Sequence, residues 1–206
     1  QHILSVIHYD MTETEVAAEL EYYMKKNGSE KPSFDTICVS GSNSSRPHGV
    51  PRPVKLEKGF LTMDYGAMVN GYHSDMTRTI CIGKADDEMK KLYNTVLTAQ
   101  QAAIEAAHPG MHNAELDKVA RDIIDGAGYA ECFGHSLGHG VGLLIHEDPR
   151  VSSGAGERTL HPGEIITIEP GIYVEGKYGC RIEDMLYITA DGKRNLTDCP
   201  KELIEV

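Results

Sequence analysis

The feature that most constrains the fold of this chain is a hairpin signal at Asn70-Gly71. The runs 59–68 and 72–82 are rich in strand-forming residues and flank this pair, which is typical of a two-residue turn between antiparallel strands. In either register that such a turn allows, Asp64 and Asp75 share one face as opposite or diagonal neighbours. Two carboxylates so close repel each other, so we expect either a cation between them or exposure of both to solvent.

The rest of the chain alternates between helical and strand-like patterns. Helices are expected between the capping residue Thr12 and Gly28, from Asp86 to about Ala107, and over about 113–126. Strands are expected at 36–40, 165–174 and 181–189. In the third helix, four residues should face inward: Leu116, Val119, Ile123 and Ile124. Helices beside hairpins indicate a mixed α+β layer fold.

Histidine and glycine are concentrated between Gly134 and Pro149, where His135, His139 and His146 lie. Glycine allows the backbone to approach a ligand closely, and histidine is the commonest nitrogen ligand and a proton carrier near neutral pH. A single histidine is usually structural, but clustered titratable groups are typical of a functional site.

Two glutamates, Glu169 and Glu183, lie in strand-like apolar runs. A buried glutamate is costly unless it is paired or bound to a metal, although each could instead face solvent on an alternating strand. Four carboxylates and one imidazole suit a pair of divalent ions. Oxygen-rich ligation favours Mn, Fe or Co, and Zn is also compatible. Two adjacent ions can bind and activate one bridging water.

These residues resemble the pita-bread metallopeptidase family, which includes methionine aminopeptidases, aminopeptidase P and prolidase. The order and spacing of the motifs agree along essentially the whole chain. The matching segments are 47–49, 64–66, 71–79, 134–149, 168–171 and 181–184. The resemblance implies an α+β pita-bread fold, in which helices flank a curved antiparallel sheet with pseudo-two-fold halves.

The resemblance also implies a role for each candidate residue. The family's metal ligands fall on Asp64, Asp75, His139, Glu169 and Glu183, with Asp75 and Glu183 bridging both ions. His48 and His146 match active-site histidines that bind substrate and stabilise the tetrahedral intermediate, and Glu169 matches the proton shuttle. His135 and Arg181 match the Xaa-Pro branch and are expected to bind substrate, although Arg181 could form a simple salt bridge.

The composition of the chain excludes some classes of binding partner. The formal net charge of −11 argues against nucleic acid and anionic membranes, and no apolar run approaches the length of a membrane span. Five irregularly spaced cysteines favour free thiols in a reducing cytoplasm over a disulfide framework. A small peptide is the expected partner, and homodimer formation stays open.

The expected function is that of a dinuclear-metal-dependent exopeptidase acting at the amino end of peptides, on Xaa-Pro bonds. Residues 1–206 would form the catalytic domain, without the amino-terminal domain of longer members. The alternatives are a methionine aminopeptidase, a metal-independent hydrolase like creatinase, and a non-catalytic binding module. The last two typically lack ligands, and none is missing here.

Overall fold

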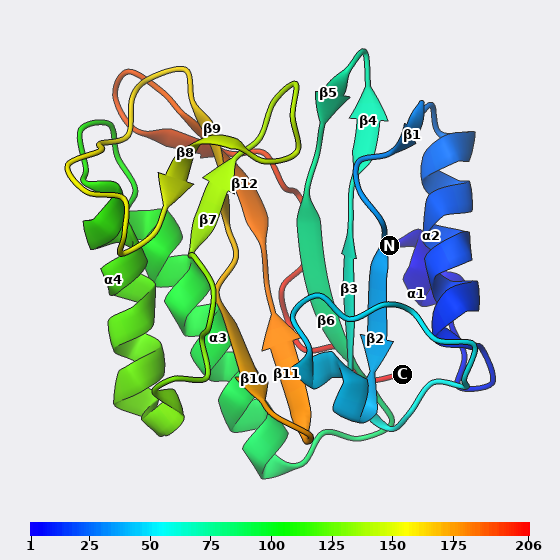
Figure 1. Ribbon diagram of the computed structural model, residues 1–206. Helices are drawn as coiled ribbons and strands as arrows, with labels where there is room; N and C mark the ends of the chain where they lie inside the picture. The colour runs from blue at the N-terminus through cyan, green and yellow to red at the C-terminus, as the bar shows by residue number, and fades with distance from the viewer.

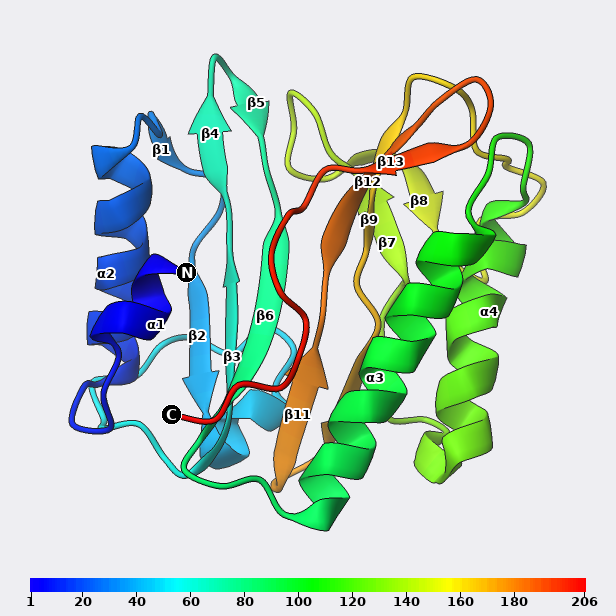
Figure 2. The ribbon, with the colours of Figure 1, turned by 180° about the vertical axis from the view of Figure 1, so that it is seen from behind.

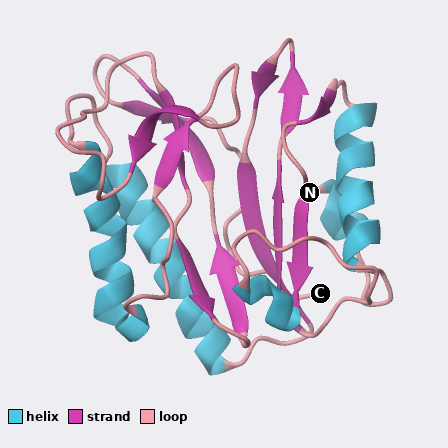
Figure 3. Ribbon diagram, in the orientation of Figure 1, coloured by secondary structure: helices cyan, strands magenta, loops and turns pink.

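Antiparallel strands in two groups form the centre of the computed structural model, which describes residues 1–206 (Figure 1). Figure 3 shows the helices at the two sides of these strands. The first half, residues 1–85, contains α1 (His2–Val6), α2 (Glu13–Lys26), β1 (Lys31–Pro32), β2 (Ile37–Ser40), the 3₁₀ turn η1 (Gly41–Ser45), β3 (Gly59–Tyr65), β4 (Ala67–Val69), β5 (Tyr72–His73) and β6 (Met76–Ile82). The second half contains α3 (Asp87–Ala106), α4 (Asn113–Ile124), the π-type turn η2 (Asp125–Tyr129), β7 (Gly138–Gly140), β8 (Glu147–Val151), β9 (Ile165–Ile168), β10 (Gly171–Val174), β11 (Tyr178–Arg181), β12 (Asp184–Ile188) and β13 (Lys193–Asn195).

The hairpin at the centre of the first half has the predicted turn. Val69 pairs with Tyr72, and Asn70 and Gly71 adopt the positive φ angles of 51° and 79° that a tight two-residue turn requires. Asp64 pairs with Thr77, so Asp75 is the diagonal neighbour of Asp64. The predicted register is therefore confirmed, and both aspartates belong to one face of the hairpin.

The two faces of the β3–β6 hairpin pack against different cores. Leu61 and Ile80 belong to a core that α1 and α2 cover. Phe60 and Cys81, which are paired with each other and point the opposite way, belong to the larger core of the second half. Because side chains alternate along a strand, the face that carries Phe60 also carries Asp64. This hairpin therefore connects the two cores and presents its aspartates to the second half.

Two helices cover the strands of the second half, whose main sheet has the order β13-β12-β9-β7-β8. Figure 2, seen from behind, shows α3 in front of these strands with α4 beside it. In α4, Leu116 and Ile124 are buried as predicted, but Val119 and Ile123 are only half-buried. Ile123 still packs against the larger core, whereas Val119 does not belong to it, because the inward stripe of the helix passes through Asp117, which is fully buried.

The two long strands predicted for the second half are each broken, so those predictions are wrong in their extent. β9 and β10 are separated by Glu169-Pro170, and β11 and β12 by Ile182-Glu183. Proline has no amide hydrogen and cannot continue the ladder at Pro170. The pairs Ile168–Asp184 and Gly171–Arg181 frame the breaks, so Glu169 lies opposite Glu183.

The halves meet where β6 runs beside residues 181–184. The Glu183 amide donates to the Thr77 carbonyl at 3.1 Å, and Thr79 Oγ1 donates to the Arg181 carbonyl at 2.9 Å. Arg78 Nη1 donates to the Glu183 carbonyl at 2.6 Å, which fixes the backbone of that glutamate. No helix combines the length and apolar character needed to cross a membrane.

Candidate metal centre

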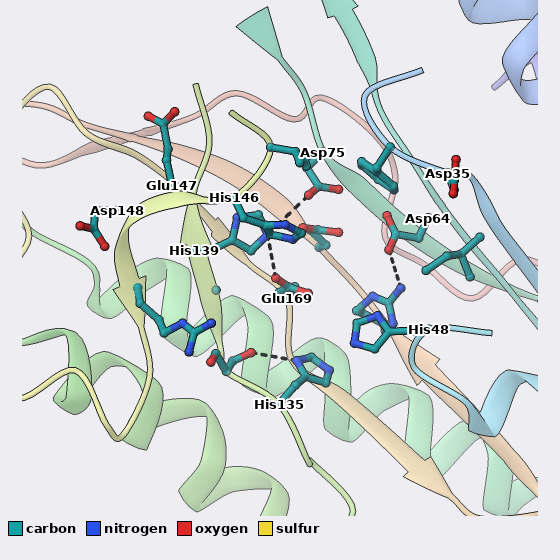
Figure 4. A pocket seen from close by; sticks show the side chains of 18 residues that line it. Asp35, His48, Asp64, Asp75, His135, His139, His146, Glu147, Asp148 and Glu169 are labelled. Atoms are coloured by element: carbon teal, nitrogen blue, oxygen red, sulfur yellow. Dashed lines mark hydrogen bonds and ion pairs between the residues drawn. The ribbon is translucent and has the colours of Figure 1, made fainter. Parts of the chain in front are cut away.

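A cleft of about 980 Å³ lies at the junction of the two halves, and every predicted site residue lines it. These residues are His48, Asp64, Asp75, His135, His139, His146, Glu169, Arg181 and Glu183. Figure 4 shows the labelled side chains of Asp75, His139 and Glu169 pointing toward one another. Residues separated by up to 135 positions therefore gather in one place, as the family resemblance implies.

The buried carboxylates are only half satisfied by the protein. Asp64 Oδ2 accepts from Arg181 Nη2 at 2.6 Å, and Glu183 Oε2 accepts from Thr77 Oγ1 at 2.7 Å. The other oxygens, Asp64 Oδ1 and Glu183 Oε1, are buried without a hydrogen-bond partner, and so is Asp75 Oδ1. Unpaired buried carboxylate oxygens are expensive in a protein interior. These atoms are suited to coordinate a cation.

His139 contributes an imidazole nitrogen to the same place. Its Nδ1 lies 3.0 Å from the Gly140 carbonyl, which can only accept, so Nδ1 carries the hydrogen. Burial lowers the pKa of His139 to about 4, so the ring is neutral and Nε2 presents a lone pair. This lone pair lies 3.3 Å from Glu169 Oε1 and 3.6 Å from Asp75 Oδ2. When the carboxylates are ionised, these lone pairs face one another, and a proton or a metal ion between them relieves the repulsion.

The pKa shifts of the clustered carboxylates also indicate that a cation fits between them. Burial, followed by the charge of Asp64, raises the pKa of Asp75 well above 3.8. Burial and the charge of Asp75 raise the pKa of Glu183, and burial raises that of Glu169 to about 8. Ligand atoms of Asp75, His139 and Glu183 lie within 4.8 Å of one another. The residues present fit a divalent metal with oxygen-rich ligation.

A hydrogen-bonded chain runs from the carboxylates into the cleft wall. The buried Arg181, besides pairing with Asp64, donates from Nη1 to the Tyr173 hydroxyl at 2.8 Å. The hydroxyl lies 2.9 Å from His135 Nε2, while His135 Nδ1 donates to the Ser136 carbonyl. Burial lowers the pKa of His135 to about 4, so Nε2 accepts from Tyr173. Both predicted substrate-binding residues thus have protein partners, and their contact with substrate stays a prediction.

Tyr173 is one of the site residues that sequence reasoning missed. It lies on β10 in a run of ordinary strand-forming residues, and no local signal distinguishes it. The contribution of Tyr173 to the site is visible only in the fold, because the pairing of β10 with β11 brings the Tyr173 hydroxyl to Arg181.

His48 and His146 are exposed, whereas the five candidate ligands are buried or half-buried. The ring of His146 packs edge-on against His139, with 4.4 Å between the ring centroids. Exposed imidazoles beside a metal cluster can reach a bound molecule, which is compatible with the predicted substrate role.

Nine further residues of the cleft were not predicted, and they include the carboxylates of Asp35, Glu147 and Asp148. Phe34, Ile37 and Ile145 form its apolar surface, and Arg150 is a cation that forms no ion pair or side-chain hydrogen bond. Arg150 lies four positions after His146, and that proximity was the one available signal. The cleft can therefore receive a small apolar group and a negative group beside the metal cluster.

Carboxylates and an imidazole gathered at a cleft define a candidate metal-binding site. Residues 1–190 match the model of metallopeptidase family M24, and the chain belongs to that family. Over 193 residues, or 93% of the chain and 55% of the relative, it is 52% identical to the Xaa-Pro dipeptidase of Pyrococcus furiosus.

Solved structures agree with this assignment. The Xaa-Pro dipeptidase from Bacillus anthracis matches with a TM-score of 0.97 and 46% identity, over 100% of this chain and 58% of that one. The X-Pro aminopeptidase from Thermotoga maritima matches with a TM-score of 0.96 and 42% identity, over 100% and 58% of the two chains. The predicted family and pita-bread fold are confirmed. The chain spans little more than half the length of these relatives.

Proposed function

We propose that the protein is a metal-dependent exopeptidase that hydrolyses the bond between an amino-terminal residue and proline in short peptides. The observation that carries this proposal is the group of buried, partly unpaired carboxylates around the neutral ring of His139, at the wall of an open cleft. Residues 1–206 act as one catalytic unit in this proposal. The free cysteines support a reducing, cytoplasmic setting.

Two divalent ions, with Mn favoured, would be held by five side chains. Asp64, Asp75, His139, Glu169 and Glu183 would supply the carboxylate oxygens and the imidazole nitrogen that hold them. When bound, the ions would lower the pKa of a water molecule and polarise the scissile carbonyl.

The protein's own groups would then move protons and stabilise charge. Glu169 would accept the proton of the attacking water and deliver it to the leaving nitrogen. His146, exposed beside His139, would stabilise the negative charge that develops on the carbonyl oxygen, and His48 would bind the substrate. Proline leaves as a secondary amine and therefore needs that proton.

The choice of Xaa-Pro substrates rests on the cleft and on the relatives. Phe34, Ile37 and Ile145 offer an apolar surface that suits a pyrrolidine ring. The unpaired guanidinium of Arg150 suits the carboxylate of a dipeptide. The relatives named Xaa-Pro dipeptidase and X-Pro aminopeptidase support the same substrate class.

Hydrolysis of Ala-Pro, Ala-Pro-Ala, Ala-Gly and Met-Ala-Ser, assayed with Mn, Co and Zn and after chelation, tests the proposal. We expect metal-dependent turnover of the proline peptides, faster for Ala-Pro, and little of the other two. Preferential cleavage of Met-Ala-Ser would favour a methionine aminopeptidase. Failure to bind stoichiometric metal would favour a binding module. Turnover by an Asp75→Ala variant shown to be metal-free would refute the ligand assignment.

A further inference from the structure

Helix α4 carries an ion pair outside the cleft in which the carboxylate is fully buried and the guanidinium is half-buried. Asp117 is 0% exposed and forms a two-point contact with Arg121 one turn later: Nε to Oδ2 at 2.9 Å and Nη2 to Oδ1 at 3.0 Å. Neither residue lines the cleft. Buried carboxylates are uncommon even when paired, so the pair needs an explanation beyond helix stability.

The remaining hydrogen bonds of this pair all go to one segment, residues 133–137. Arg121 Nη1 donates to the Phe133 carbonyl at 2.8 Å, and Nη2 donates to the His135 carbonyl at 3.1 Å. Asp117 Oδ1 accepts from the Leu137 amide at 3.0 Å. The guanidinium also lies 4.3 Å from the centroid of the Phe133 ring. The pair therefore holds three alternate residues of the segment, Phe133, His135 and Leu137, by their backbone groups.

The same segment and the preceding residue, Cys132, are also hydrogen-bonded to Glu169 and Tyr173. The Leu137 carbonyl accepts from the Glu169 amide at 2.8 Å, and the Cys132 carbonyl accepts from the Tyr173 amide at 2.9 Å. The His135 ring reaches the Tyr173 hydroxyl at 2.9 Å. A shift of the segment would therefore displace His135 and Glu169 together.

We infer that Asp117 and Arg121, here named the α4 clamp, are positioning residues that hold His135 and Glu169 in their working geometry from outside the cleft. This inference rests on the proposed function. The clamp contacts neither substrate nor metal in this scheme, and it acts only through the backbone of residues 133–137. Misplacement of a catalytic group by about 1 Å can cost about a hundredfold in rate.

The test compares Arg121→Ala with Lys118→Ala. Lys118 forms an exposed ion pair with Asp122 on the same helix and at the same spacing, so it is a matched control. With Ala-Pro as substrate at 25 °C, kcat of Arg121→Ala should fall about tenfold to a hundredfold, with KM changed less than about threefold. Lys118→Ala should behave as wild type. Added guanidinium ion should restore part of the lost kcat, which a general loss of folding would not allow.

A second readout does not depend on catalysis. The Leu137 amide has Asp117 as its acceptor, so its hydrogen exchange, measured by NMR, should accelerate about tenfold or more in Arg121→Ala and in Asp117→Asn, but not in Lys118→Ala. If wild type cleaves no peptide, the proposed function fails while exchange still tests the clamp. If Arg121→Ala does not fold, Arg121→Lys takes its place. Wild-type kcat in the folded variant, or unchanged exchange at Leu137, would overturn the inference.

Discussion

Replacing Glu13 with alanine should strongly destabilise the protein, because this carboxylate organises the segment between β2 and β3. Glu13 is fully buried at the start of α2. It accepts from the Ser40 amide at 2.7 Å and hydroxyl at 2.9 Å, from Asn43 Nδ2 at 3.3 Å, and from the Arg52 amide, Nε and Nη2 at 2.9, 3.0 and 2.8 Å. The segment that it fixes carries His48 into the cleft.

The magnitude follows from the groups left without a partner. In Glu13→Ala, the amides of Ser40 and Arg52 lose their acceptor, at about 1–3 kcal/mol each. The sum is about 4 kcal/mol. The Arg52 side chain is 36% exposed and can turn to water, so its charge adds little to this cost. The melting temperature should fall by about 8–16 °C in a chain of this size.

Urea unfolding followed by circular dichroism measures this loss. Glu13→Gln keeps the shape but not the charge and should lose about 2 kcal/mol, because charge-assisted hydrogen bonds are about twice as strong as neutral ones. Glu15→Ala, two residues away in the exposed capping box, is the matched control and should lose about 1 kcal/mol. A loss below about 1 kcal/mol in Glu13→Ala would refute the reasoning.

Three further outcomes are expected. Tyr173→Phe removes the hydroxyl between Arg181 and His135, so kcat for Ala-Pro should fall about tenfold with little change in urea stability; an unchanged kcat would contradict this. Asp75→Asn should abolish metal uptake in calorimetric titration. Its metal-free form should nevertheless be more stable than metal-free wild type, because burial and the charge of Asp64 raise the pKa of Asp75. A metal-free variant less stable than metal-free wild type would contradict this electrostatic explanation. Burial raises the pKa of Glu13, but hydrogen bonds from Arg52 and Ser40 outweigh burial and lower it below 4.5. The stability gap between wild type and Glu13→Gln should therefore be largest above pH 4.5 and narrow as the pH falls, and a gap constant from pH 7 to 3 would exclude this linkage.

Short sequence patterns correctly predicted the turn and the helix cap, which depend only on residues close together in the chain. The hairpin turn at Asn70-Gly71 and the capping box at Thr12 depend on residues a few positions apart, and both are observed. The shared face of Asp64 and Asp75 follows from the register of that hairpin alone. The convergence of these aspartates with the distant ligands came from the family resemblance, because periodicity carries no information about contacts between halves.

Features that depend on tertiary partners were missed. Asp117 replaces an apolar residue on the inner face of α4 because Arg121 and residues 133–137 surround it, and no pattern within the helix indicates those partners. The broken strands were predicted as continuous because apolar composition continues through Ile182. Their breaks occur at Glu169 and Glu183, where the backbone departs from the ladder to bring carboxylates to the cleft.

The position of the ligands at the junction of the halves has a thermodynamic consequence. Of the proposed ligands, Asp64 and Asp75 come from residues 1–85, while His139, Glu169 and Glu183 come from the remainder, so neither part alone would complete the proposed coordination. Any free energy gained by capturing cations is therefore also cohesion between the two parts, and it grows with the logarithm of the free ion concentration. The free metal-ion concentration around the protein would therefore govern its free energy of unfolding as well as its turnover.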